Sequence, residues 1–371
     1  MNSRRRPRIV FVHSILFFGS TERYLQDLVE RIDAEELEVW LVAPDHPALA
    51  PLLELDPLRG RVVHVRTPGR PFEYRRVLRR LRPDLVHSID VDPPALLGAR
   101  LAGTRHLVVT YHTPEHRPRD NRRGRLLRRL AWATRPQVIF TSEPDRGTGI
   151  ALDHIAPART HVIPFGIDFE RFSPATPDRL RSELGLAPEA RVVGTVGLLR
   201  PQKAHDDLIR AAAEVVRHEP ELTFVVVGEG ELREQLERQV REQGLDGRFL
   251  LLGQRDDVPG LVAGFDVFVL SSRFEGMCLA VAEAMAMAKP VVATAVGGVR
   301  QSVISGESGL LVPPGDPHAL AEGILRVLRN TAEARSLAAA GRERALALYG
   351  LDRMVDETTA LYRRLLASVE K

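Results

Sequence analysis

Two carboxylates flank a turn whose chemistry suits a phosphorylated sugar. Glu275 and Glu283 are separated by seven residues and follow an apolar run that ends at Leu270. Glu275 falls in the loop after that run and can accept hydrogen bonds from sugar hydroxyls. Glu283 falls one to two turns into the next helix and can accept from a ribose diol. Carboxylates suit paired hydroxyls because they only accept, at four lone-pair sites. The alternative is an ordinary helix with exposed acids.

The backbone between the two carboxylates adds a feature that favours an anion. Gly276 permits close approach of a ligand, and Met277, Cys278 and Leu279 place their N–H groups where the helix begins. A helix N-terminus carries unpaired donors and partial positive charge, so it suits a diphosphate.

A second turn supplies a cation. Lys203, one of three lysines in a chain that is otherwise basic through arginine, follows the β-rich run Val192–Val196. Its ammonium beside a helix N-terminus can neutralise a leaving diphosphate, and Arg200 can assist. A solvated basic turn is the alternative interpretation. The nearby glycines do not have the spacing of a dinucleotide fingerprint.

The first half of the chain offers weaker candidates. Gly19 and Ser20 lie between the first expected strand and helix, where small residues let the backbone approach a ligand; a plain helix start with a Ser cap is the alternative. His112 ends an expected strand and can bond the acceptor or the transferring sugar, although a single histidine also serves structural roles. His87, one strand earlier, is a weaker candidate. Asp and His residues do not cluster as metal ligands do, so no metal is expected.

The elements that must position these residues alternate between β and α. Runs of Val, Ile and Leu indicate strands buried on both faces, and the alternation predicts parallel sheets with ligands at the carboxyl ends of the strands. Expected strands are Arg8–His13, Glu38–Ala43, Arg61–Arg66, Asp84–Ser88, His106–Tyr111, Gln137–Thr141, Val192–Val196, Thr223–Val227, Phe249–Leu252, Asp266–Leu270, Val291–Thr294 and Leu310–Val312. Expected helices include Glu22–Ile32, Asp206–His218, Leu232–Gln243, Leu279–Ala288, Pro317–Arg329 and a last stretch from Asp352 to Val369.

Two successive α/β sets predict two domains, and 371 residues suit two cores better than one. We expect Rossmann-like domains over residues 1–165 and 191–350, a proline-rich linker over 166–190, and a C-terminal helix over 351–371 that packs back across both.

Charge and composition bear on partners and location. The first half is basic, and the stretch Arg117 to Arg135 interleaves arginines with Leu126, Leu127 and Leu130. This is typical of an amphipathic helix on an anionic membrane or of the solvated face of an ordinary helix. Nucleic acid is not favoured, because aromatic residues do not interleave with the arginines.

A single cysteine excludes an intrachain disulfide and agrees with a cytoplasmic location. Basic residues before the apolar stretch Ile9 to Phe18 are similar to a secretory signal, but no cleavage site follows, which favours a buried first strand. No other apolar stretch approaches the roughly 18 residues of a membrane span.

The order and spacing of these motifs resemble the family-four retaining glycosyltransferases of the GT-B fold, nearly end to end. The most specific mark is the Glu275-x7-Glu283 block with its following Ala-Met-Ala-Met-Ala-Lys-Pro. Also matching are Gly297-Gly298-Val299, Gly309-Leu310-Leu311-Val312-Pro313, Gly253 to Ser271, and Val162-Ile163-Pro164-Phe165-Gly166-Ile167-Asp168.

The resemblance implies roles for the candidate residues. Glu275 would contact the donor sugar and Glu283 the ribose. The Gly276 to Leu279 backbone and the Lys203 side chain would hold the diphosphate, which the Gly19–Ser20 turn would approach. His112 would face the reacting sugar. The base would lie near Gly253, Gln254 and Arg255, and Val299 would help to close the donor pocket. Leu198 stands where the family has arginine, so one diphosphate cation is missing unless Arg200 replaces it.

The implied function is transfer of a hexose-type sugar, with retention, from a nucleotide diphosphate-sugar to an acceptor hydroxyl. A UDP- or GDP-sugar is the expected donor, and no further cofactor is expected. The N-terminal domain would bind the acceptor, which the sequence leaves open, and the C-terminal domain the donor. The alternatives are another GT-B enzyme, such as a nucleotide-sugar 2-epimerase, and a non-catalytic protein that binds sugar nucleotides.

Overall fold

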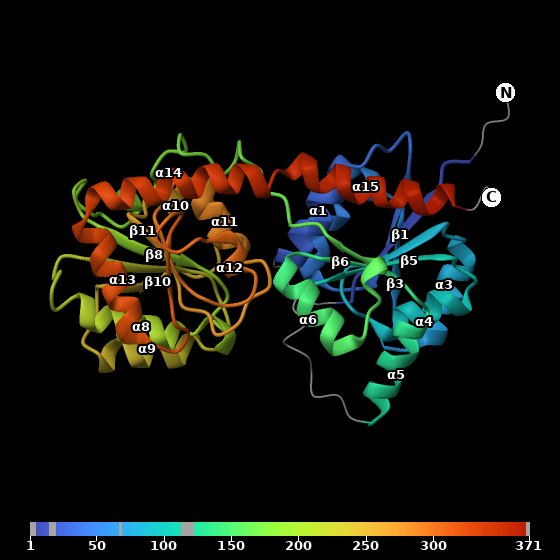
Figure 1. Cartoon of the computed structure of the whole chain (residues 1–371), viewed down its shortest axis with the longest axis horizontal. Coiled ribbons are helices and arrows are strands. Elements are labelled where there is room, and N and C mark those ends of the chain that lie inside the picture. The colour runs from blue at the N-terminus through green and yellow to red at the C-terminus, as the bar shows by residue number, and fades with distance from the viewer. Residues whose placement is uncertain (1–4, 15–19, 67–68, 113–121, 369–371) are drawn as a thin grey trace. The chain divides into compact units, whose positions relative to one another are not determined.

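The computed structural model describes residues 5–14, 20–66, 69–112 and 122–368. The chain forms two compact units: unit 1 comprises Met1–Gly166 and Leu351–Lys371, and unit 2 comprises Ile167–Gly350. Each unit is built on its own parallel sheet (Figure 1). The prediction of two parallel-sheet, Rossmann-like α/β domains is confirmed.

Unit 1 contains seven parallel strands in the order β3-β2-β1-β4-β5-β6-β7. Ile9, Val10 and Phe11 of β1 are fully buried, as expected of a strand covered on both faces. The strands are β1 (Arg8–Val12), β2 (Glu38–Pro44), β3 (Val62–Val65), β4 (Leu85–Ser88), β5 (His106–Tyr111), β6 (Gln137–Phe140) and β7 (Thr160–Val162). The helices are α1 (Ser20–Arg31), α2 (Ala50–Leu53), α3 (Pro71–Leu81), α4 (Pro93–Leu101), α5 (Arg122–Ala133), α6 (Glu143–Asp153) and α15 (Leu351–Ala367).

Unit 2 contains six parallel strands in the order β10-β9-β8-β11-β12-β13. The strands are β8 (Val192–Val196), β9 (Thr223–Val227), β10 (Phe249–Leu251), β11 (Val267–Leu270), β12 (Val291–Thr294) and β13 (Leu310–Val312). The helices are α7 (Leu180–Glu183), α8 (His205–Val215), α9 (Arg233–Glu242), α10 (Val258–Ala263), α11 (Leu279–Ala286), α12 (Val299–Ser302), α13 (Pro317–Arg329) and α14 (Thr331–Leu348). A one-turn 3-10 helix, η4 (Pro201–Lys203), precedes α8.

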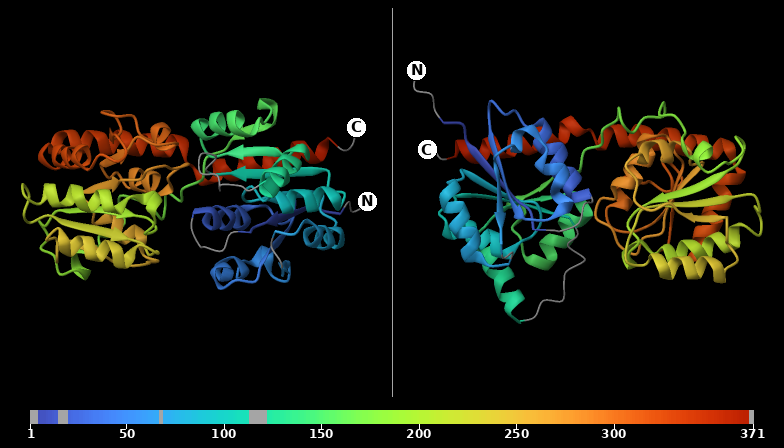
Figure 2. Two further views of the ribbon diagram at one scale, coloured as in Figure 1. Left: turned by 90° about the horizontal axis from the view of Figure 1, so that it is seen from below. Right: turned by 180° about the vertical axis from the view of Figure 1, so that it is seen from behind.

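Helices cover both faces of each sheet (Figures 1 and 2). In unit 2, α8 packs between α9 and α13 on one face, and α11 packs against α14 on the other. In unit 1, α3, α4 and α5 form one row, and α1 packs against α15. In each sheet the chain first adds strands on one side and then crosses to the other side, between β1 and β4 in unit 1 and between β8 and β11 in unit 2. The loops that follow these neighbouring strands diverge there.

The structure adds elements that the sequence analysis does not predict, chiefly the short strand β7 and the long helix α14. It also places most of the expected linker in unit 2, because Phe172 and Leu180 are buried there and Arg179 N donates to Gly260 O at 3.1 Å. The last helix, α15, belongs to unit 1, while α14 before it belongs to unit 2.

Candidate active site

The candidate site in unit 2 lies where strand order reverses. Strands β8 and β11 are hydrogen-bonded neighbours. The loop after β8 contains η4 with Lys203, and the loop after β11 carries Glu275 and leads into α11. Carboxyl ends of parallel strands meet at one edge of a sheet, so two residues about 70 positions apart in sequence come together.

Lys203 and Glu275 form a largely buried ion pair. Lys203 Nζ donates to Glu275 Oε1 at 2.6 Å, and the side chains are 18% and 6% exposed. Ser272 Oγ donates to the same oxygen at 2.6 Å, and Gln202 Nε2 lies 3.3 Å from Oε2. The sequence analysis predicts roles for Lys203 and Glu275 but not for these two polar neighbours, whose residue types are too common to stand out.

The charge state of Lys203 follows from this pairing. Burial is the largest single effect and lowers the pKa of Lys203, but the charge of Glu275, the neighbouring Cys278 and the hydrogen bond to Glu275 together outweigh it and raise the pKa above its ordinary value. The lysine is therefore a fixed cation at neutral pH. A charge-assisted contact in a poorly solvated place is stronger than its surface equivalent.

The turn between Glu275 and α11 is well packed. Met277 and Cys278 are buried, and Cys278 is the extended N-cap residue of α11. Burial, followed by the charge of Glu275, raises the pKa of the Cys278 thiol to about 12. The first turn of α11, which begins at Leu279, holds no acidic residue, so the positive end of the helix dipole keeps its sign there. Glu283 is half-buried in the second turn.

Gly297 lies very close to the backbone of Glu275. Gly297, in the loop after β12, has φ of +37°, and a Cβ there would lie 1.7 Å from the carbonyl oxygen of Glu275. The close approach explains the small residue in this motif. Val299, two residues later, is fully buried in α12, so its side chain packs in the interior of unit 2.

The other donor-binding candidates of unit 2 lie on neighbouring loops. Gly253 has φ of +74°, and its carbonyl accepts from Gly228 N at 2.9 Å. Gln254 lies between Gly253 and Arg255. Arg255 is engaged by Glu183 and Asp257, with Nη2 2.7 Å from Glu183 Oε2 and Nε 2.9 Å from Asp257 Oδ1.

These ion pairs hold the Arg255 guanidinium within unit 2. Arg200 is half-buried directly before η4. The Arg200 carbonyl accepts from Lys203 N at 3.0 Å.

In unit 1, His112 follows β5 and donates from Nε2 to the carbonyl of Ile89 at 2.6 Å. Nδ1 is buried, with no hydrogen-bond partner among the residues that the structure describes. Burial lowers the pKa of His112, against the opposing charge of Asp90. The ring is therefore neutral near pH 7, with Nδ1 as a hydrogen-bond acceptor. Gly19 lies outside the described residues, and Ser20 begins α1.

Unit 1 contains a buried polar pair, His13 and Glu22, that the sequence analysis does not predict. His13, which directly follows β1, is 1% exposed, and its Nε2 lies 3.0 Å from Glu22 Oε1 in the first turn of α1. The available signal was a histidine at a strand end followed by an acid in the next helix. His87 has a structural role, because its nitrogens lie 2.6 Å from Tyr362 Oη and 2.7 Å from Thr110 Oγ1.

In the described part of the chain, histidine, cysteine and acidic side chains do not gather in groups of three or more that could hold a metal ion. None of the helices in those ranges is long and apolar enough to cross a membrane.

The two parallel-sheet units define the GT-B fold class, and comparisons with known proteins give the family. Residues 190–330 match the family model described as "Glycosyl transferases group 1", and residues 21–171 match "Glycosyltransferase Family 4". The chain belongs to this glycosyltransferase family and is a glycosyltransferase.

Curated relatives carry several glycosyltransferase activities. The UDP-Gal:alpha-D-GlcNAc-diphosphoundecaprenol alpha-1,3-galactosyltransferase of Escherichia coli is 30% identical over 263 residues, 68% of this chain and 68% of the relative. The 2-deoxystreptamine glucosyltransferase of Streptomyces kanamyceticus is 31% identical over 63% of this chain and 62% of the relative. A D-inositol 3-phosphate glycosyltransferase of Nocardioides sp. is 34% identical, and the match spans 58% of this chain and half of that relative.

Solved structures agree on the fold. HepE of Anabaena in complex with UDP and glucose superposes with a TM-score of 0.83 at 25% identity, covering 97% of this chain and 100% of that chain. Sucrose-phosphate synthase of Thermosynechococcus elongatus superposes with a TM-score of 0.81 at 24% identity, covering 98% and 100%. The three curated relatives are named as glycosyltransferases, and they lend no support to the epimerase alternative.

Proposed function

We propose that the enzyme transfers a hexose-type sugar from a UDP-sugar to an acceptor hydroxyl, with retention at the anomeric carbon. The Lys203–Glu275 pair carries this proposal, because it sets a cation and a hydroxyl-binding carboxylate 2.6 Å apart beside the N-terminus of α11. UDP in the HepE complexes, and UDP-Gal in the name of the Escherichia coli relative, favour a uridine donor over GDP.

Each group has a distinct task in the proposed reaction. The bond between the sugar C1 and the β-phosphate oxygen breaks, and its electron pair stays on the diphosphate. The acceptor oxygen bonds to C1 on the same face, and its proton passes to the departing phosphate. Lys203 and the α11 N-terminus stabilise the growing negative charge, and Arg200 can add to it. Glu275 orients the sugar through lone pairs that Lys203, Ser272 and Gln202 leave open.

The remaining assignments extend this site. We assign donor binding to unit 2, with the ribose on Glu283 and the base near Gly253 to Arg255. We assign acceptor binding to unit 1. His112 is assigned to the reacting sugar because its neutral ring keeps Nδ1 as an acceptor for a hydroxyl. The acceptor is a saccharide, a lipid or a natural product.

Variants of the ion pair test the function. Glu275→Ala and Lys203→Ala should each lower turnover by about 100-fold or more, because each removes a group that acts on developing charge or on sugar orientation. Lys203→Arg, which keeps the charge, should retain more turnover than Lys203→Ala. Released nucleotide and glycosylated product should be measured together. Wild-type turnover in either alanine variant, with folding intact, would contradict the assignment.

The donor base can be identified first. UDP, GDP, ADP and dTDP should be compared for their effect on the melting temperature, since a ligand that binds only the native state raises it. We expect UDP to give the largest shift and Lys203→Ala to reduce that shift. A larger shift with GDP would reassign the base and leave the rest of the site unchanged.

We also propose peripheral contact with the inner, anionic face of a membrane through α5. Leu126 and Leu130 are 57% and 46% exposed, one turn apart, and exposed Arg122 and Arg129 lie on the same helix. Apolar residues flanked by arginines suit an anionic interface. Leu126→Ser with Leu130→Ser should abolish co-flotation with phosphatidylglycerol vesicles. Unchanged flotation would indicate an ordinary solvated helix.

A further inference from the structure

The three carbonyl groups of η4 are all held by the segment that follows β11. Arg273 Nη1 donates to Pro201 O at 2.7 Å, Arg273 N donates to Gln202 O at 2.8 Å, and Ser271 Oγ donates to Lys203 O at 2.8 Å. Consecutive carbonyls of a 3-10 turn thus have their partners in one three-residue segment. Two of the three bonds come from Arg273.

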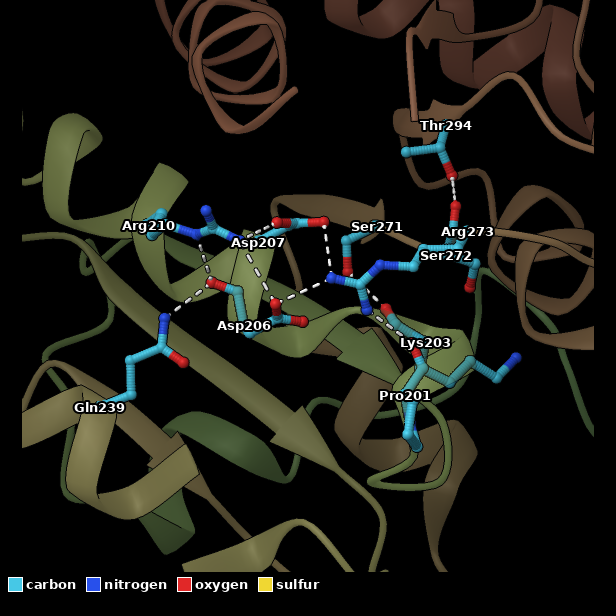
Figure 3. A network of polar contacts seen from close by, with 10 residues as sticks. All are labelled: Pro201, Lys203, Asp206, Asp207, Arg210, Gln239, Ser271, Ser272, Arg273 and Thr294. Carbon is cyan, nitrogen blue, oxygen red and sulfur yellow. Dashed lines mark hydrogen bonds and ion pairs between the residues drawn. The ribbon is translucent and has the colours of Figure 1, made fainter. Parts of the chain in front are cut away.

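The Arg273 guanidinium also reaches the first turn of α8. Nη2 lies 2.8 Å from Asp206 Oδ2 and 3.4 Å from Asp207 Oδ2, and Figure 3 shows the three side chains converging. Burial raises the pKa of Asp206, but the hydrogen bond and charge of Arg273, the charge of Arg210 and a backbone hydrogen bond together lower the pKa below its ordinary value. Asp206 is therefore ionised. The rigid, planar guanidinium of Arg273 bridges η4, which contains Lys203, and the first turn of α8.

The holding segment is itself fixed to the sheet. Ser271 and Ser272 are buried, and Thr294 Oγ1, at the end of β12, donates to Ser272 O at 2.7 Å. Glu275 follows Arg273 by two residues in the same loop. In Figure 3 the Lys203 side chain points away from Asp206 and Asp207. The network therefore hydrogen-bonds to the backbone of Lys203, while the Lys203 ammonium donates to Glu275.

We propose that Arg273 is a positioning residue, which holds η4 so that the ammonium of Lys203 stays opposite Glu275. Arg273 acts through Lys203. The consequence for turnover depends on the proposed function, whereas the consequence for the backbone of η4 does not.

The chain offers a matched control in Arg210. This arginine is 49% exposed, against 41% for Arg273, and pairs with the same carboxylates of Asp206 and Asp207. Its described bonds go to those two residues, not to the carbonyls of η4. Arg210→Ala therefore removes comparable charge and ion pairing without releasing the loop.

The first experiment needs no ligand. Amide hydrogen exchange should be compared in the wild type, Arg273→Ala and Arg210→Ala, because exchange reports local opening. We expect exchange at the amide of Lys203, which donates to Arg200 O at 3.0 Å, to rise about 10-fold or more in Arg273→Ala and to stay near wild type in Arg210→Ala. Equal exchange in the two variants would overturn the proposal.

The second experiment is a double-mutant cycle on UDP affinity and turnover. Arg273→Ala alone should weaken UDP binding about 10-fold and lower kcat about 10- to 100-fold, since displacement of a charge-stabilising group by an ångström has effects of this size. In the Lys203→Ala background, Arg273→Ala should change UDP affinity less than about 2-fold, because residues that act as one unit are not additive. Arg273→Lys should retain part of the UDP affinity and turnover that Arg273→Ala loses.

The two proposals fail in different ways. Additive effects in the cycle would mean that Arg273 does not act through Lys203 and would overturn its positioning role. Wild-type UDP affinity and turnover in Lys203→Ala would refute the proposed role of Lys203, and the hydrogen-exchange comparison would still decide whether Arg273 holds η4.

Discussion

At the scale of single residues, sequence reasoning finds charged groups better than it finds their partners. Lys203 and Glu275 stand out because of their types and their places after strands, and the structure pairs them. Ser272, Gln202 and Arg273 do not stand out, because a serine, a glutamine or an arginine in a loop has many explanations. Their roles appear only when the loops after β8 and β11 are brought together.

One prediction concerns the single cysteine. Burial and the charge of Glu275 raise the pKa of Cys278 to about 12, and the thiolate is the reactive form. At pH 8 the folded enzyme should therefore react with a disulfide reagent at least about 100-fold more slowly than the urea-unfolded chain. The absorbance of the released thiolate measures both rates. Comparable rates would show that the thiol is accessible and ionised, and Cys278→Ser provides the blank.

At the scale of elements, the alternation of apolar runs and amphipathic segments predicts, to within a few residues, all the described strands except β7 and the helices whose ranges it gives. Two of the elements that it misses have clear physical reasons. β7 has only three residues, so period-two alternation cannot be recognised, and His161 interrupts it. α14 buries Leu337, Ala338, Gly341 and Ala345, and small residues give a weak apolar stripe. Neither omission affects the loops that carry the candidate site.

A glycine in the loop after β12 gives a prediction at this scale. Gly297→Ala should lower the free energy of unfolding by about 2–4 kcal/mol and turnover by more than about 100-fold, because the new Cβ collides with the carbonyl of Glu275. Gly306→Ala is the control. Gly306 has φ of +81°, but its Cβ would meet nothing within 4 Å. That variant should lose about 1 kcal/mol and keep its turnover. Urea unfolding and initial rates distinguish the two, and equal losses would contradict the collision.

At the scale of the whole molecule, two α/β sets predict two parallel-sheet units, but not the path of the chain between them. The proline-rich stretch 166–190 is expected to be a linker, and within it Phe172 and Leu180 are buried in unit 2. A high proline content indicates irregular backbone, but such a segment can still pack its side chains against a domain. Sequence pattern likewise cannot assign α15 to unit 1, because that depends on tertiary partners such as His87.

Each unit should lose stability in acid through a buried histidine. Burial, followed by the neighbouring His112, lowers the pKa of His87 in unit 1 to about 3, and burial, followed by the charge of Lys203, lowers the pKa of His205 in unit 2 to about 4. Below about pH 6.5 the unfolded chain binds protons that the folded chain does not. Stability is therefore complete above pH 6.5 and should fall as the pH drops towards 4, by about 1.4 kcal/mol per pH unit for each histidine.

The slope of unfolding free energy against pH, measured between pH 4 and 6, tests this expectation. His205→Gln should flatten the slope for unit 2, whatever its effect on absolute stability. His318→Gln is the control, because the His318 side chain is 68% exposed. An unchanged slope in His205→Gln would mean that His205 is protonated in the native state.

The helix α15 has a consequence for biosynthesis. Tyr362, fully buried against the first sheet, reaches the ribosome exit only after all of unit 2 has emerged. During synthesis, the strands of unit 1 therefore lack the cover of α15, so that His87 and its apolar neighbours stay uncovered while unit 2, a continuous segment of the chain, can already fold. Premature termination near Gly350 would release a chain whose second half can be native and whose first half remains a substrate for chaperones.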